Sequence, residues 1–158
     1  MTEENQIKER GPGPFMMSIY IILFLIIAAY LFFGVFSPWY YGKSARVMAT
    51  KTMHAQTIKY IKSEHNKCKT GESKFMSNSQ DCPATAAKAV TGAVAKITDK
   101  NPFDTSKNAV REFNNNIDDK DVGFINLSAS GSSVVIRSCI SKPCYDEKNR
   151  LQDSVKIE

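Results

Sequence analysis

The sequence lacks the residue patterns that most enzymes and metalloproteins carry. It holds only two histidines, and its four cysteines show no C-x₂-C spacing. No phosphate-binding glycine loop and no nucleophile elbow are present. The acidic residues Asp118, Asp119 and Asp121 lack the glycine and the distant glutamate of a calcium-binding loop. We therefore expect no catalytic residue, no metal site, no cofactor and no small-molecule substrate.

Charged residues are missing from positions 15–36, which are almost wholly apolar. A helix of that length covers ~33 Å, enough to cross the hydrocarbon core of a membrane. The run is too long for a signal peptide, and its exit through Phe36-Ser37-Pro38 offers no small-residue cleavage site. Trp39, Tyr40 and Tyr41 follow, where aromatic rings would lie at the lipid headgroups. The sequence predicts a disordered cytoplasmic tail over residues 1–14, a transmembrane helix over 15–37 and a soluble domain over 38–158.

Cysteine is scarce but even in number, which in a small anchored domain favours disulfides and an oxidising compartment. Each local pair flanks a polar, turn-rich loop, so we expect Cys68 to bond Cys82 and Cys139 to bond Cys144. Reduced thiols and a metal site are the alternatives. Crossed pairs would require the end of the long helix to meet the end of the hairpin.

The charged residues on either side of the apolar run conflict with placing the C-terminal domain in an oxidising compartment. Lys8 and Arg10 precede it, whereas Lys43, Arg46 and Lys51 follow it. The positive-inside rule alone would weakly place the C-terminal domain in the cytoplasm. We give the cysteines more weight, and expect a cytoplasmic N-terminus with the domain in the periplasm or outside the cell.

Hydrophobic periodicity predicts the elements of the soluble domain. Pro38 should kink the helix, which then continues amphipathically to about Lys67. A second helix should begin at Pro83, after the polar loop 68–82. Residues 101–104 read as a turn, 123–129 and 133–140 as a hairpin, and 153–158 as a last strand. We expect the long helix to bury Met48, Ala55, Ile58 and Ile61 against strand residues Phe124, Ile125, Leu127, Val134 and Ile136. His54 and His65 should lie near the same stripe and either pack or form local hydrogen bonds.

This order of elements resembles the type IV pilins and pseudopilins. The matching segments are the apolar helix with its early proline, the segment 37–46, the Asn-Pro-Phe-Asp turn at 101–104, the glycine-led strand 123–127, and Cys68 with Cys82 at the end of the long helix. The resemblance covers residues 15–158. It implies an α+β, pilin-like fold in which a long N-terminal helix packs on a small antiparallel sheet.

One part of the pilin pattern is absent. Pilin precursors are cut after a glycine, and the mature chain has a glutamate at its fifth position. Here Gly13 is followed by Pro14, and residues 15–36 contain no glutamate. The chain therefore lacks the charge thought to pair with a neighbour's N-terminal amine during assembly.

The resemblance implies a structural subunit or accessory component of a pilus or secretion machine, located at the bacterial surface and acting in adhesion. Its partners would be membrane lipid and pilin-like subunits, contacted through Phe15, Gly34, Phe36 and Pro38; the small Gly34 would permit close helix approach. The alternative is an anchored binding or inhibitory protein that does not polymerise. The net charge of +5 is spread along the chain, and Lys142, Lys148 and Arg150 are the candidate contacts for DNA or another surface ligand.

Overall fold

The described part of the protein is α+β, and its first element is an apolar helix. The computed structural model describes residues 13–113 and 115–157, so the predicted tail falls almost entirely outside the described residues. The chain divides into two compact units, Met1–Gly42 and Lys43–Glu158. Each unit is described by itself below.

Residues 14–69 are helical, with one change of helix type. Helix α1 spans Pro14–Leu31, a π-helical segment η1 spans Phe32–Phe36, and α2 spans Ser37–Lys69. Proline at the start of α1 suits a position whose N–H would have no partner within the helix. Pro38 has no N–H to donate to the carbonyl of Gly34, and the π-helical segment ends two residues before this proline. The predicted irregularity is present, one turn earlier than the proline itself.

A four-stranded sheet forms the centre of the second unit, in the order β5-β6-β7-β8. Its strands are β5 (Val110–Glu112), β6 (Ile125–Ser130), β7 (Ser133–Cys139) and β8 (Arg150–Lys156). The hairpin β6–β7 and the pair β7–β8 are antiparallel, as predicted. The predicted antiparallel sheet of three or four strands is confirmed for β6, β7 and β8, but the fourth strand departs from it because β5 pairs with β6 in parallel. The long loop after β5 returns the chain to the same end of the sheet and makes that pairing possible.

Helix α3 (Ala86–Lys96) begins at its cap residue Thr85, whose hydroxyl accepts a hydrogen bond from the Lys88 N–H. Its buried face is made of small residues, among them Ala89, Gly92 and Ala93. A side chain at Gly92 would collide with Met76, so the glycine lets the 75–79 turn approach the helix. Three short elements complete the unit: the hairpins β1 (Lys74–Phe75) with β2 (Gln80–Asp81) and β3 (Lys100–Asn101) with β4 (Asp104–Asn108), and the 3-10 turn η2 (Glu147–Asn149).

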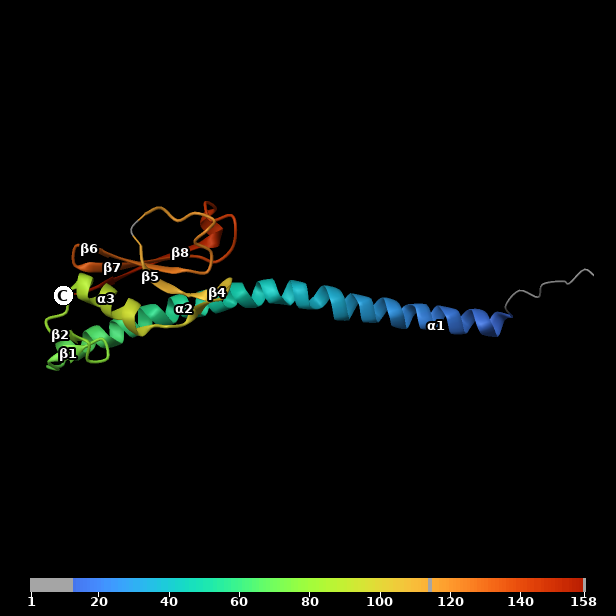
Figure 1. The fold of residues 1–158 in the computed structure, drawn as a ribbon, viewed down its shortest axis with the longest axis horizontal. Coiled ribbons are helices and arrows are strands. Elements are labelled where there is room, and N and C mark those ends of the chain that lie inside the picture. The colour runs from blue at the N-terminus through green and yellow to red at the C-terminus, as the bar shows by residue number, and fades with distance from the viewer. Residues whose placement is uncertain (1–12, 114, 158) are drawn as a thin grey trace, which may run out of the picture. The chain divides into compact units, whose positions relative to one another are not determined.

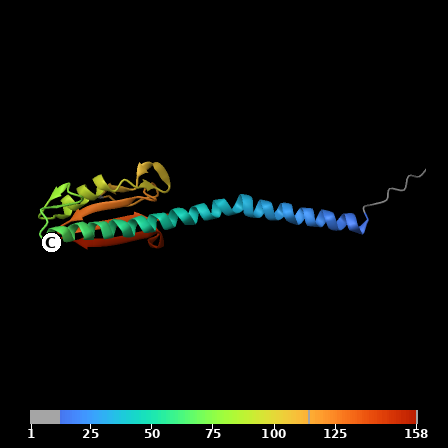
Figure 2. The same cartoon turned by 90° about the horizontal axis from the view of Figure 1, so that it is seen from below.

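The core lies between the two helices and one face of the sheet (Figures 1 and 2). All five residues predicted for this core are buried: Phe124, Ile125, Leu127, Val134 and Ile136. The last four belong to the strands and pack with Ile61 of α2, Val90 of α3 and the turn residues Phe75 and Met76. The prediction is wrong for Phe124, which precedes β6 and lies against Arg111 instead of in this core.

The buried face of α2 differs from the prediction. Ile61 is fully buried and Ile58 is half-buried, but Ala55 is exposed and Met48 is 60% exposed. Thr50, His54 and Thr57 are buried instead. The two threonine hydroxyls donate to the carbonyls of Arg46 and Met53, one turn earlier, so their burial leaves no hydroxyl hydrogen without an acceptor. The helix is rotated so that a mostly polar stripe faces the sheet.

The turn predicted at residues 101–104 connects β3 to β4. The fully buried Asn101 accepts a hydrogen bond from the Phe103 N–H and donates one to the Val122 carbonyl. Gly123 follows with a φ of +81°, and a side chain there would strike Asn101. Glycine at this position thus lets the turn close onto the entry to β6.

Candidate functional site

Helix α1 presents apolar side chains around its whole circumference. The segment Phe15–Gly34 is long and apolar enough to span a membrane, a test of length and composition that a signal sequence also meets. None of this segment is buried among the described residues, and Phe24 and Tyr30 are 70% and 76% exposed. In water such a surface would be unfavourable at about 25 cal/mol per Å² of apolar area. Lipid or neighbouring helices would remove that cost.

The four predicted assembly residues lie along this helix and its junction with α2. Phe15 is exposed near the start of α1, and Gly34 has no described atom within 4 Å of where a side chain would project. Phe36 ends the π-helical segment and Pro38 is the second residue of α2. The position of Gly34 permits close approach by another helix; whether one binds there stays a prediction.

The first disulfide joins Cys68, in the last turn of α2, to Cys82 after β2, with 5.6 Å between the Cα atoms. This confirms the predicted pair. The Glu64 carboxylate reinforces the junction because it accepts hydrogen bonds from the Lys67 ammonium group (2.7 Å) and the Ser77 N–H (3.0 Å). Burial alone would raise the pKa of Glu64, but these hydrogen bonds outweigh it and lower that pKa below its usual value.

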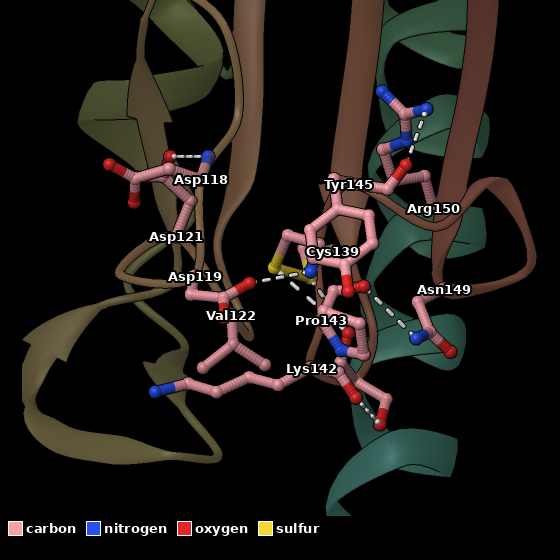
Figure 3. Close-up of a disulfide and its surroundings, with 12 residues drawn as sticks. Asp118, Asp119, Asp121, Val122, Cys139, Lys142, Pro143, Tyr145, Asn149 and Arg150 are labelled. Carbon is pink, nitrogen blue, oxygen red and sulfur yellow. Dashed lines mark hydrogen bonds between the residues drawn. A yellow bond between two sulfur atoms is a disulfide. The ribbon is translucent and has the colours of Figure 1, made fainter.

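The second disulfide, Cys139–Cys144, closes the loop between β7 and η2 and also confirms the prediction. Figure 3 shows the Asp119 side chain reaching this loop, where it accepts a hydrogen bond of 2.6 Å from the Cys144 N–H. Tyr145, the next residue, is 79% exposed. The disulfide loop and the acidic segment 118–121 therefore form one connected surface.

The acidic residues of that segment have structural partners. Asp121 is buried and pairs with Arg111, while Asp118 accepts a hydrogen bond from the Lys120 N–H. Within the part of the chain that the structure describes, no group of three or more His, Cys, Asp or Glu side chains could hold a metal ion.

The basic residues predicted to contact DNA or a surface ligand surround the second disulfide. In Figure 3, Lys142 and Arg150 lie on different sides of it and point away from each other. The Arg150 guanidinium donates to the Tyr145 carbonyl at 3.2 Å, and Lys148 is exposed on η2. The three residues share a region without forming a single cluster, and their role in binding DNA stays a prediction.

A buried polar network links α2 to the sheet. His54 Nδ1 lies 2.7 Å from Ser138 Oγ on β7, and His54 Nε2 lies 2.9 Å from Asp153 Oδ2 on β8. The arrangement contains the residue types of a catalytic triad, but the serine is fully buried and its histidine is 3% exposed. In this geometry the three residues fix the register of the helix on the sheet. His54 is packed in the interior, as one of the two expected alternatives has it, but its hydrogen bonds are not local, since both partners are far away in sequence.

His65, one turn before the first disulfide, is also buried, but neither ring nitrogen has a hydrogen-bond partner among the described residues. Burial, reinforced by the charge of Lys69, lowers the pKa of His65 from its ordinary value of 6.5. Burial therefore favours the neutral form of this imidazole in the folded protein.

Arg111, which sequence analysis did not single out, organises the other face of the sheet. Its guanidinium lies 3.9 Å from the centre of the Phe124 ring and 4.6 Å from that of Phe113. It also donates to Asn126 Oδ1 at 2.7 Å and pairs with the buried Asp121 carboxylate. These contacts hold the loop between β5 and β6 against the sheet. The spacing of the residues along the chain gives no sign of the cluster, because it depends on the parallel pairing of β5.

Comparison of the chain with protein-family models, with curated proteins and with solved structures finds no significant match.

Proposed function

We propose that the protein is a membrane-anchored, pilin-like structural subunit or accessory component of a pilus or secretion machine. The observation that carries the proposal is the succession of a fully exposed apolar helix, a helix packed on a small sheet, and a disulfide at that helix's end. The pilin family combines the same features in the same order. In this chain each of these features suits the assembly of subunits rather than catalysis.

The apolar helix supplies the means of assembly. Its side chains are exposed on all sides, so neighbouring helices can pack against any face of it. The close approach possible at Gly34 and the break in helix type before Pro38 lie near the end of the apolar segment. Helix packing in the membrane therefore requires no further structural change in this chain.

The second unit would present a surface to binding partners outside the membrane. The loop closed by Cys139–Cys144 is tied to the segment 118–121 and carries the exposed Tyr145. Both disulfides favour an oxidising compartment, which supports a periplasmic or extracellular domain with the N-terminus in the cytoplasm.

The missing glutamate favours a second version of this function. Without a carboxylate in residues 15–36, the chain cannot offer the usual partner for a neighbour's N-terminal amine. The alternative is thus a pilin-like protein that stays in the membrane, where it binds or inhibits other subunits without polymerising.

Photo-crosslinking from the apolar helix tests the proposal. A benzoylphenylalanine in place of Phe24, which is 70% exposed, should form crosslinks to this chain or to other pilin-like subunits in the native membrane. The same probe at Tyr145 is the control, because it reports contacts of the second unit alone. Crosslinks from position 24 to lipid alone would contradict assembly through this helix.

N-terminal sequencing of the membrane-extracted protein distinguishes the two versions. A methylated Phe15, Met16 or Met17 would indicate processing and a polymerising subunit. An N-terminus at Met1 or Thr2 would instead support the retained, non-polymerising form.

A further inference from the structure

A row of four polar side chains crosses the face of the sheet opposite α2. Arg111 of β5 pairs in register with Asn126 of β6, Asn126 with Arg137 of β7, and Arg137 with Gln152 of β8. Residues directly opposite each other on neighbouring strands point to the same face. Figure 1 shows the loop between β5 and β6 on this side of the sheet. The row is therefore partly covered, and its charges are partly removed from water.

Two hydrogen-bond donors in the middle of this row are buried and unsatisfied. Neither Asn126 Nδ2 nor Arg137 Nε has a partner among the described residues. The orientation of the Asn126 amide is fixed, because its oxygen must accept from Arg111 Nε. A buried donor without an acceptor costs about 1–3 kcal/mol, and more when the group is charged. The middle of the row therefore holds more hydrogen-bond donors than acceptors.

The two arginines of the row differ in how their charges are balanced. Arg111 pairs with Asp121 and lies between two aromatic rings. Arg137 makes only one long hydrogen bond, from Nη2 to the Phe113 carbonyl at 3.4 Å, and pairs with no carboxylate in the described chain. Its guanidinium therefore keeps an uncompensated positive charge in a partly buried position, which is unfavourable without a counter-charge.

A cleft of about 390 Å³ opens at Arg137. Arg150 supplies a second guanidinium to its lining, and Gln152 and Asn116 supply amides. Ile117 and Leu151 provide apolar surface, and the volume falls within the ~300–1,000 Å³ of small-ligand sites. Like Arg137, Arg150 has no ion-pair partner within the described residues. The cleft thus combines two arginines that have no ion-pair partner with one carboxylate, that of Glu147, with neutral amides and with a small apolar wall.

We propose that this cleft binds the oxyanion group, a carboxylate or a phosphate, of a small ligand. Arg137 would donate through its terminal guanidinium nitrogens, because its Nε is buried out of reach of the cleft. Arg150 contributes the second positive charge, and Ile117 with Leu151 contacts a short apolar portion of the ligand. Glu147 also lines the cleft, and its negative charge opposes that of the ligand.

The most direct probe is the side-chain Nε–H resonance of Arg137, recorded by NMR on the full chain in nanodiscs of zwitterionic lipid. Inorganic phosphate and acetate are titrated separately at constant ionic strength, with chloride as the reference salt. Saturable movement of the Arg137 signal is expected with at least one probe, and the tighter probe identifies a phosphate or a carboxylate as the preferred group. Absence of saturation with both probes would overturn the proposal.

Variants distinguish specific binding in the cleft from nonspecific attraction by the positive charge of the surface. Arg150→Gln should weaken binding about tenfold, because one charge-assisted hydrogen bond is lost. Glu147→Gln should strengthen binding several-fold. Lys148→Gln is the matched control, since it removes the same charge as Arg150→Gln from a neighbouring exposed residue outside the cleft lining. Equal weakening by Arg150→Gln and Lys148→Gln would show nonspecific attraction and overturn the proposal. All of these variants keep Arg137. A change in binding therefore cannot be caused by a loss of whatever contribution Arg137 makes to the stability of the fold.

Discussion

The helices α1 and α2 follow one another in the chain but differ in which residues they expose and which they bury. The large apolar side chains of α1 are exposed among the described residues, whereas α2 buries threonine, histidine and glutamate together with Ile61. For α1, the surrounding medium must supply the apolar contacts; for α2, strands β7 and β8 supply hydrogen-bond partners. The number of exposed residues alone therefore does not indicate what surrounds a helix. The indication comes from the polarity of the side chains that the helix exposes and buries.

The largest expected effect follows from placing charges on α1. Leu25→Lys combined with Ile26→Lys replaces two exposed apolar residues near the middle of the segment. Two lysines at the membrane centre cost about 6 kcal/mol, so the protein should shift from the carbonate-resistant membrane fraction to the soluble or aggregated fraction. The matched control, Met48→Lys with Ala49→Lys, adds the same charges at exposed positions of the second unit. Equal loss of membrane retention in both variants would contradict the assignment of α1 as the anchor.

The two disulfides should differ in their contribution to the second unit. Replacing Cys68 and Cys82 by serine opens a loop with a sequence separation of 14, and should lower the free energy of unfolding by about 3 kcal/mol. The same change at Cys139 and Cys144 opens a separation of 5, and should cost about 2 kcal/mol. Denaturant unfolding of the full chain in nanodiscs measures both. A larger loss from the second pair would mean that its connection through Asp119 matters more than loop length.

The observed orientation of α2, with His54 buried and Met48 exposed, can be tested with one variant on each side of the helix. His54→Ala removes the hydrogen bonds to Ser138 and Asp153 and leaves a cavity, so it should lower the free energy of unfolding by about 2–3 kcal/mol. Met48→Ala, on the exposed side of the helix, should change it by no more than about 0.5 kcal/mol. The reverse order of effects would restore the face that hydrophobic periodicity predicts.

That failed prediction shows where sequence reasoning stops. Periodicity found the helix, its length and Ile61, because aliphatic spacing reflects local geometry. It could not find the Thr50–His54–Thr57 stripe, since polar residues become favourable inside only when their partners are in place. Ser138 and Asp153 lie on strands far along the chain, and nothing near His54 indicates them.

The difference between contacts that are local in sequence and contacts that are distant explains which other features of the fold could be predicted. The hairpin and both disulfides were predictable because their turn residues and paired cysteines lie close in sequence. The parallel strand β5, the Arg111 cluster and the cleft at Arg137 were not. Each depends on the route of the β5–β6 connection, which no local pattern specifies.

The smallest expected effect is a pH dependence at the end of α2. Because burial lowers the pKa of His65 below its ordinary 6.5, the unfolded chain takes up a proton there before the folded one. The associated stability is therefore complete above about pH 6.5 and is lost as the pH falls through the lowered value. His65→Leu should reduce the difference in melting temperature between about pH 7.5 and about pH 5.5. An unchanged difference would place the pH dependence elsewhere.

Glu64 adds a second loss of stability at lower pH. Its lowered pKa stabilises the folded chain above the ordinary value of 4.5 and ceases to do so as the pH falls through the folded-state value. His65→Leu should leave this acid transition in place, whereas Glu64→Gln should diminish it. The loss linked to His65 thus begins below its ordinary pKa of 6.5, and the loss linked to Glu64 begins only below its ordinary pKa of 4.5.

The central claim is that the second unit folds by its own contacts while α1 serves the membrane. The most direct measurement is the thermal unfolding of residues 43–158 expressed without the preceding segment in an oxidising compartment, combined with size-exclusion chromatography. This unit contains both disulfides, the His54 network and the buried core. We predict a soluble monomer with one cooperative transition, at a lower temperature after reduction. Aggregation or a lack of cooperative unfolding in the oxidised form would contradict the claim and make α1 part of the fold.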